Sequence, residues 1–268
     1  MKNWDLITEA LKYINSTHKA VKVVQVGAMD GFSFDDIRGH LENFKWDEIL
    51  VEPIPDVFNS LQVNLSHRDN CIFENSAITE GDGLVEMITV SKDLIDKNDL
   101  HPGYLGMSAL YPLKNGFGTN YKRDIFVKEN YASKIKVNGI SFNTLIQKHN
   151  ISNIDIFICD AEGYDWTIFK QLDLNTFSPL FIRLEYINLT KQEQFLVKEK
   201  LEQHDYIFEI GQDVTAVKRD IYNKINCSQN NIINKTEPKE CIYKQTIVTG
   251  LWNINRPGRD FNHYIEAF

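Results

Sequence analysis

Hydrophobic residues along the chain follow a helical period first and a strand-like period directly afterwards. Residues 4–14 carry apolar side chains three or four positions apart, which predicts an amphipathic helix. Residues 21–26 are then mostly β-branched and end at Gly27, a pattern typical of a buried parallel strand. The alternation continues, with strands predicted at 49–51, 71–78, 84–90, around Val137, at 154–159 and 180–185, and helices at 33–44, 55–65, 142–149, 165–172 and 191–204.

The order of these elements predicts the fold class. Strands that alternate with helices of about ten residues indicate βαβ units and a parallel sheet with right-handed crossovers. Two further strands, predicted at 206–210 and 214–218, are separated by only three residues, which permits an antiparallel hairpin and leaves no room for a crossover helix. We therefore expect an α/β, Rossmann-like fold, with a mostly parallel seven-stranded sheet, an antiparallel closing hairpin and helices on both faces.

A long segment, residues 91–131, has no clean period and contains several glycines. A loop of that length inside a compact domain is usually functional, and its glycines suit a lid over a substrate. His101 within it is a candidate base, because the pKa of free histidine is about 6.5. The alternative is that this histidine is merely solvated.

The carboxyl ends of the predicted strands carry the residues that point to a ligand, because open α/β sheets bind ligands at this edge. The first end is a turn with two glycines, which let the backbone approach a ligand. The second end offers an acid that can accept hydrogen bonds from two ribose hydroxyls, and the third lies where an adenine edge would be. The turn is not GxGxxG, which favours S-adenosylmethionine over NAD as the cofactor. The predicted cofactor-binding residues at these three ends are Gly27, Ala28, Asp30, Gly31, Glu52, Pro53, Ser76 and Ala77.

Four of these segments resemble the FkbM-type S-adenosylmethionine-dependent methyltransferases: residues 23–31, 50–53, 75–78 and 154–163. The resemblance covers roughly residues 20–220, and the Asp-x-Glu-Gly block at its last strand is the most specific part. It implies a class I methyltransferase fold, to which the closing hairpin belongs, whereas nicotinamide dehydrogenases normally keep the sheet parallel. It also implies O-methylation, commonly of sugars, polyketides or other secondary products. Gln25 departs from the Asp that many members carry, so cofactor contact at this position stays open.

Three acidic residues are the candidate catalytic residues: Asp160, Glu162 and Glu185. Methyl transfer to oxygen needs alignment of the reacting atoms and removal of the hydroxyl proton. One carboxylate can act as a general base, or Asp160 and Glu185 with Asn188 can bind a divalent metal ion, as in catechol-type O-methyltransferases. In a third interpretation, Glu162 is structural and Asp160 binds the amino group of the cofactor.

Composition and charge exclude several classes of protein. The 268 residues include 29 basic and 37 acidic ones, a net charge of -8, which argues against a partner bound through nucleic-acid phosphates. Four scattered cysteines without CxxC spacing indicate neither a zinc site nor a disulfide framework. Because no apolar window has the ~18 residues of a membrane helix and no signal peptide is recognisable, we expect a cytoplasmic protein without a transmembrane segment.

The last part of the chain predicts a second unit. We expect a methyltransferase domain over residues 1–221, a polar linker at 223–240, and the start of another domain within 222–268. Residues 243–250 and 261–268 resemble the opening of a nucleotide-sugar glycosyltransferase-like domain of bacterial surface-polysaccharide loci. The alternative is that this tail packs back on the first domain. From the family resemblance, the expected acceptor is a sugar of capsule or lipopolysaccharide synthesis, or its nucleotide-sugar precursor. An NAD-dependent oxidoreductase and a non-catalytic adenosine-binding module are the rival functions.

Overall fold

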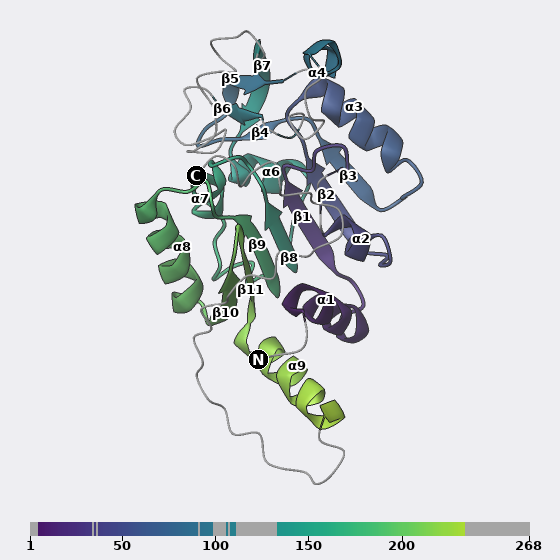
Figure 1. Ribbon diagram of the computed structural model, residues 1–268, viewed down its shortest axis with the longest axis vertical. Coiled ribbons are helices and arrows are strands. Elements are labelled where there is room, and N and C mark those ends of the chain that lie inside the picture. The colour runs from purple at the N-terminus through teal and green to yellow at the C-terminus, as the bar shows by residue number, and fades with distance from the viewer. Residues whose placement is uncertain are drawn as a thin grey trace.

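The computed structural model describes residues 5–33, 35, 37–90, 92–98, 106, 108–110 and 133–233 (Figure 1). Two sheets and helices on both sides of the larger one make up this part of the chain. The strands of the larger sheet are β1 (Lys22–Val26), β2 (Asp47–Val51), β3 (Cys71–Glu74), β8 (Ile156–Cys159), β9 (Phe181–Glu185), β10 (Tyr206–Ile210) and β11 (Asp213–Lys218). The helices are α1 (Leu6–Thr17), α2 (Arg38–Leu41), α3 (Pro55–Asn64), α4 (Lys92–Asn98), α6 (Phe142–Lys148), α7 (Asp165–Phe169), α8 (Lys191–Gln203) and α9 (Arg219–Ile233).

The larger sheet has seven strands in the order β10-β11-β9-β8-β1-β2-β3. Its strands run parallel except β11, which is antiparallel to both of its neighbours, β10 and β9. The chain moves outward from β1 to β3 and returns to the other side of β1 with β8, so the strand order reverses between β1 and β8. The predicted Rossmann-like fold with an antiparallel closing hairpin is confirmed, and this reversal is where such sheets bind ligands.

Helices cover both faces of the larger sheet because its buried strands are apolar on both sides. On one face, Val24 and Val26 of β1 belong to a core with α6, α7 and α8. On the other face, Val23 packs in a core with α1, α2 and α9, and α3 covers Leu50 nearby. Three predicted helices, α3, α6 and α8, end within one residue of the expected positions.

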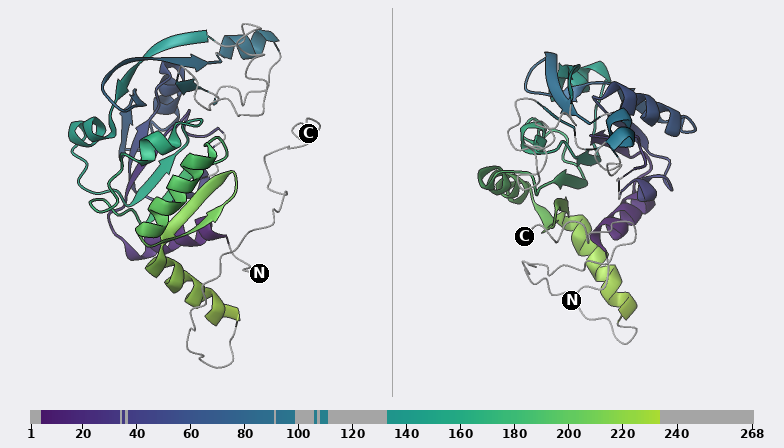
Figure 2. Two further views of the ribbon diagram at one scale, coloured as in Figure 1. Left: turned by 90° about the vertical axis from the view of Figure 1, so that its left-hand side faces the viewer. Right: turned by 45° about the horizontal axis from the view of Figure 1, so that its top comes forward.

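The second sheet was not predicted. Its four strands, in the order β4-β7-β5-β6, are β4 (Ala77–Ile78), β7 (Ser133–Ile140), β5 (Gly83–Thr89) and β6 (Ala109–Leu110). The single strand expected at 71–78 is therefore wrong: β3 ends at Glu74, and the chain crosses into the second sheet. Likewise, the short strand expected around Val137 is eight residues long. Figures 1 and 2 place this small sheet at the end of the molecule opposite α9.

The helix expected at 33–44 is also wrong, since α2 is the only helix among the described residues of this range. The backbone before it is held by two aspartates instead of by helical hydrogen bonds. Asp30 accepts hydrogen bonds from the N–H groups of Phe32 and Ser33, and Asp35 accepts those of Ile37 and Arg38. Aspartates compete with helix formation in this way, because the side chain satisfies backbone donors locally.

Helix α9 crosses the predicted domain limit at residue 221. Residues 223–233 of the expected linker are therefore helical. Ile221 and Ile225 lie four residues apart on this helix and are buried in the core shared with α1. Residues 234–268, with the predicted strand and helix of a second domain, and His101 lie outside the described residues. The two-domain division stays a prediction. None of the helices described is long and apolar enough to cross a membrane.

Candidate functional site

The turn after β1 lies directly against the end of β8. The N–H groups of Gly27 and Ala28 both donate to the carbonyl of Val51, at 3.0 Å each. Gly27 has a φ of +80°, and a Cβ at this position would lie 1.9 Å from the carbonyl oxygen of Asp160. Gly27 is therefore required by the approach of two strand ends to each other. Gly31, with a φ of +81°, packs against the side chains of Leu61 in α3 and of Leu65, the C-cap of this helix.

Glu52 joins the end of β2 to this turn. Its carboxylate accepts a hydrogen bond from the N–H of Met29 at 3.0 Å and another from the N–H of Ile54 at 2.8 Å. The side chain is only 6% exposed. Burial raises the pKa of Glu52 from 4.5 to about 7, although the two backbone hydrogen bonds oppose this shift. The predicted ribose acid thus lies beside the predicted glycine turn.

Asp30 has a different environment from Glu52. Besides the two backbone donors of its own loop, its carboxylate accepts a hydrogen bond from the hydroxyl of Ser33 at 2.7 Å. Its backbone carbonyl accepts a hydrogen bond from Asn64 of α3 at 2.8 Å. The structure therefore commits the side chain of Asp30 to the shape of the loop, next to Glu52.

The predicted adenine edge lies where the chain leaves β3 for β4. The side-chain amide of Asn75 donates to the carbonyls of Glu52 at 2.8 Å and Pro53 at 3.2 Å. Ser76 is fully buried, and its hydroxyl donates to Glu74 at 2.6 Å. Ala77 is also buried, as the first residue of β4. Within the described part of the chain, the amide oxygen of Asn75 makes no hydrogen bond, so Asn75 is the side chain of this edge with an acceptor to offer a ligand.

The structure brings the three predicted catalytic carboxylates together. Oxygen atoms of Asp160, Glu162 and Glu185 all lie within 4.8 Å of one another. Asn188 connects two of them, donating to Glu185 at 2.6 Å and to Glu162 at 3.3 Å. Burial, together with the neighbouring negative charges, raises the pKa values of Glu162 and Glu185 well above their usual range. This carboxylate cluster can hold a proton or a cation, because like charges this close do not all ionise unaided.

The sequence analysis did not identify Asp165, which holds the turn that carries Glu162 of this cluster. Asp165 is fully buried and accepts hydrogen bonds from the N–H groups of Ala161 at 3.2 Å and Gly163 at 3.3 Å. It thereby holds a turn in which Glu162 has a φ of +49°, a strained value for a residue other than glycine. The available signal was an acid at the start of the helix that follows Asp-x-Glu-Gly.

Gln25 is the position at which the chain departs from the resembled family, and its side chain is bonded to other side chains of the protein. Its side chain is buried on the α2 face of the sheet. It donates to Asp35 at 2.8 Å and accepts from Arg38 at 3.3 Å. An aspartate here would be shorter and would add a second negative charge beside Asp35, so glutamine suits this position.

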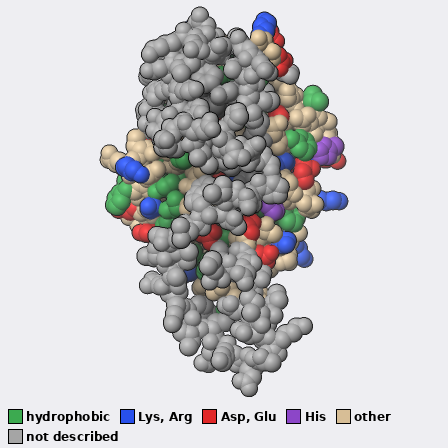
Figure 3. All heavy atoms as spheres, viewed as in Figure 1, with side chains coloured by type: hydrophobic (Ala, Val, Ile, Leu, Met, Phe, Trp, Pro, Cys, Tyr) green, Lys and Arg blue, Asp and Glu red, His purple; other side chains and the backbone are tan. Residues whose placement is uncertain are grey.

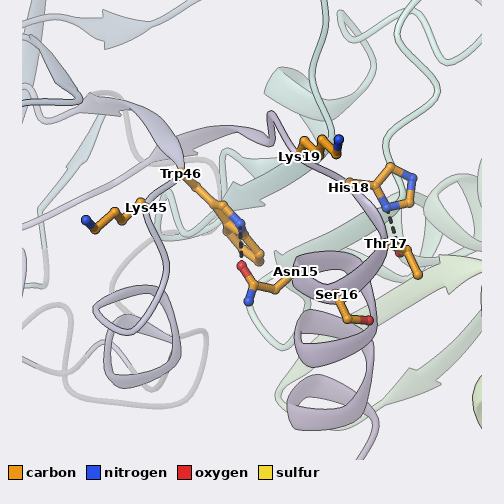
Figure 4. A pocket seen from close by; sticks show the side chains of 7 residues that line it. All are labelled: Asn15, Ser16, Thr17, His18, Lys19, Lys45 and Trp46. Atoms are coloured by element: carbon orange, nitrogen blue, oxygen red, sulfur yellow. Dashed lines mark hydrogen bonds between the residues drawn. The ribbon is translucent and has the colours of Figure 1, made fainter.

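A cavity of about 310 Å³ lies away from the carboxylate cluster of Asp160, Glu162 and Glu185, between the end of α1 and the start of β2. Trp46 lines it and donates to Asn15 at 3.1 Å, while Lys19 and Lys45 extend away from each other (Figure 4). Its cationic groups therefore do not converge on one ligand. Where described side chains are visible in Figure 3, acidic and basic ones are interspersed. The candidate site is thus the edge formed by β1, β2, β8 and β9.

Comparison with protein families agrees with the sequence resemblance. A family model described as "Methyltransferase FkbM domain" matches residues 25–214, more than half of the chain. No curated protein matches it in sequence. Among solved structures, methyltransferase FkbM from Methylobacillus flagellatus KT aligns with a TM-score of 0.46 and 11% identity, over 78% of this chain and 47% of that one. The METTL16 methyltransferase domain aligns with a TM-score of 0.42 and 9% identity, over 80% of this chain and 66% of that one. The human methyltransferase 10 domain containing protein aligns with a TM-score of 0.36 and 10% identity, over 82% of this chain and 85% of that one. The chain thus spans about half the length of the bacterial FkbM structure.

Proposed function

The chain belongs to the FkbM methyltransferase family, and we propose that it transfers the methyl group of S-adenosylmethionine to a sugar hydroxyl. The acceptor is a capsule or lipopolysaccharide sugar, or its nucleotide-sugar precursor. One observation carries the proposal: the glycine turn, Glu52 and the carboxylate cluster meet at the carboxyl edge where the strand order reverses. This edge is the ligand site of open α/β sheets.

The cofactor is bound by the first three strand ends in this proposal. Gly27, Ala28, Asp30 and Gly31 shape the turn beside the amino-acid part, and Glu52 accepts hydrogen bonds from the ribose hydroxyls. Pro53 and the segment Asn75–Ala77 border the adenine. Glu52 keeps lone pairs for the ribose, because each carboxylate oxygen accepts only one backbone hydrogen bond in the structure.

The reaction needs the acceptor oxygen, the methyl carbon and the sulfur in line, so alignment is the main contribution of the site. Asp160 is the exposed member of the carboxylate cluster, while Glu162 and Glu185 are half-buried behind it. Asp160 therefore meets the acceptor hydroxyl and takes its proton, and Glu162 and Glu185 stabilise that proton within the cluster.

In a second version of the mechanism, a divalent metal ion would activate the acceptor hydroxyl. Hard cations prefer carboxylate oxygens, and the spacing of the three carboxylates fits a shared ion. Asp160, Glu162 and Glu185 would hold it, with Asn188 adjacent, and the ion would lower the pKa of an acceptor hydroxyl. Activity that vanishes in EDTA and returns with magnesium or manganese would favour the metal, and full activity in EDTA would leave the metal-free base.

Two measurements test the proposed function. Calorimetry should show that S-adenosylhomocysteine binds and NAD does not, and tight NAD binding alone would instead indicate an oxidoreductase. Mass spectrometry with a labelled methyl donor and a panel of sugar nucleotides should then show methyl incorporation into a sugar. Incorporation into protein or RNA would contradict the carbohydrate acceptor, and cofactor binding without turnover on any acceptor would indicate a non-catalytic module.

The pH dependence of cofactor binding should follow Glu52. Because the ionised carboxylate is the better acceptor for ribose hydroxyls and its pKa is about 7, the affinity for S-adenosylhomocysteine should rise about tenfold between about pH 6 and pH 8. The stability of the unliganded protein should show the opposite pH dependence at this group. The folded state binds more protons than the unfolded state between pH 4.5 and about 7, so the contribution of Glu52 to stability is lost as the pH rises through this window.

Calorimetry at several pH values checks this, with Glu52→Gln as the comparison. The variant should bind more weakly at pH 8 and show little pH dependence. An unchanged pH dependence in the variant would assign the effect to another group.

The cytoplasmic location and the second unit within residues 222–268 stay part of the proposal. If the tail belongs to another domain, limited proteolysis should cut after α9 and leave a core that still binds S-adenosylhomocysteine. Protease resistance of the tail, together with loss of cofactor binding on its deletion, would make it part of the same domain.

A further inference from the structure

Glu74, the last residue of β3, carries a buried carboxylate that none of the proposed steps uses. It is 3% exposed and accepts hydrogen bonds from the hydroxyl of Ser76 at 2.6 Å, from Nζ of Lys148 at 2.8 and 3.0 Å, and from Nε2 of His149 at 2.7 Å. Burial alone would raise the pKa of Glu74, but the hydrogen bonds from Lys148, Ser76 and His149 outweigh it and lower the pKa. The group is therefore a fully bonded carboxylate anion at neutral pH.

This carboxylate connects three separate elements. Lys148 ends α6, and His149 is its C-cap. Ser76 lies between the two sheets and accepts a hydrogen bond from Asn138 of β7 at 3.1 Å. Glu74 thus ties the edge of the larger sheet to α6 and, through Ser76, to the small sheet. His149 lies at the end of a helix, but this position alone does not explain why its ring is bonded to the carboxylate of Glu74.

The segment held between these bonds is the proposed adenine edge. The backbone carbonyl of Glu74 accepts a hydrogen bond from the N–H of Glu52 at 3.0 Å. Asn75, the next residue, binds the carbonyls of Glu52 and Pro53 through its amide nitrogen. Beyond Ser76, Ala77 and Ile78 pair with Gly139 and Ile140 of β7. Movement of Glu74 or Ser76 would therefore shift Asn75 relative to the ribose acid.

We propose that Glu74, together with Lys148 and His149, is a positioning group that sets the adenine edge at Asn75–Ala77 and so determines recognition of the adenine base. The inference deepens the proposed function and depends on it. The amide oxygen of Asn75 is an acceptor that suits the amino group of adenine, and it reads that group only while the segment is fixed. Glu74 touches no ligand itself. A site built to bond a given group discriminates strongly against an analogue that lacks it.

The test measures cofactor binding and needs no acceptor substrate. Calorimetry would compare S-adenosylhomocysteine with its deaminated analogue, S-inosylhomocysteine, which has a carbonyl in place of the adenine amino group. Wild-type protein should prefer the adenine compound. Glu74→Gln, which leaves Lys148 and His149 with an uncharged partner, should weaken binding of the adenine compound about tenfold, and the preference over the inosine compound should shrink. A role in stability alone would leave that preference intact.

Glu80→Gln is the matched control. Glu80 lies just after β4 and pairs with Lys170, the C-cap of α7, at 2.5 Å, and its side chain is 58% exposed. Its replacement should leave both affinities unchanged. His149→Phe removes one hydrogen bond of Glu74 by changing a side chain that is 14% exposed, and it decides the question if Glu74→Gln does not fold.

The outcomes separate the two levels of the proposal. If wild-type protein binds no S-adenosylhomocysteine, the proposed function itself fails. If wild-type protein binds it while Glu74→Gln and His149→Phe retain the affinity and the base preference, Glu74 is not a positioning group. An equal loss of affinity for both compounds would likewise overturn the inference, since it would indicate a general effect on the fold.

Discussion

Replacement of Asp160 by asparagine is expected to lower methyl transfer by a factor of at least ~10², the lower range for removal of a positioned acid–base group. Asparagine has the same shape but does not take up the proton of the acceptor hydroxyl, and it is a weaker ligand for a cation. The fold should survive, because the strand-end hydrogen bond at this position is made by the backbone N–H of Asp160 to Val26 at 3.0 Å. Steady-state rates with a labelled methyl donor and the melting temperature measure both effects.

Asp173→Asn is the matched control for this substitution. Asp173 lies beyond the other end of α7, where its carboxylate accepts hydrogen bonds from the N–H of Asn175 and the hydroxyl of Thr176 within its own turn. Loss of its charge should leave the rate unchanged. Full activity of the Asp160→Asn variant would remove both the base and the metal versions of the mechanism, and the carboxylate cluster would then be structural.

Replacement of Gly27 by alanine is expected to destabilise the protein by about 3 kcal/mol or more. Overpacking typically costs about 1–3 kcal/mol, and a positive φ adds about 1–2 kcal/mol for a residue with a Cβ. Here the new Cβ would lie 1.9 Å from the carbonyl oxygen of Asp160, which is backbone and cannot rotate away. The ends of β1 and β8 must separate, so binding of S-adenosylhomocysteine should weaken as well. Urea unfolding and calorimetry measure the two changes.

Gly39→Ala provides the comparison at a helical glycine. Gly39 lies in α2, and a Cβ added there meets nothing within 4 Å. Alanine should be neutral or stabilising by up to about 1 kcal/mol, because glycine loses more backbone entropy on folding. Equal stability of the two variants would show that the strand ends tolerate separation, and the close approach at Gly27 would then be irrelevant to the site.

The parts of the site that sequence analysis predicted all depend on short stretches of chain. Buried runs such as residues 154–159 define a strand, and parallel strands bring their carboxyl ends to one edge. That rule alone places Glu52 near the turn at Gly27, and Asp160 near Glu185, although Glu185 lies 25 positions later in the sequence. The resemblance to the FkbM family rests on the same short blocks and is confirmed by the family match.

What the side chains do at these positions depended on tertiary contacts. Asp30 and Glu52 are both acids at strand ends, yet the loop takes up the carboxylate of Asp30, whereas Glu52 bonds the backbone of another strand end. The missing side chain of Gly27, which was expected to let the backbone approach a ligand, also makes room for the backbone carbonyl of Asp160, just after β8. Distinctions of this kind need the distance between atoms remote in sequence, which hydrophobic periodicity does not contain.

By itself, the sequence determined the order of strands and helices, the parallel sheet with its antiparallel hairpin, and the family. Only the tertiary structure decided that residues 71–78 divide between two sheets and that residues 223–233 are helical. It also decided that Glu74 binds His149, 75 residues away. The physical reason is the range of the interactions. Periodicity records which face of a local segment is buried, whereas a change of sheet or a buried ion pair is stabilised by partners that only folding brings within bonding distance.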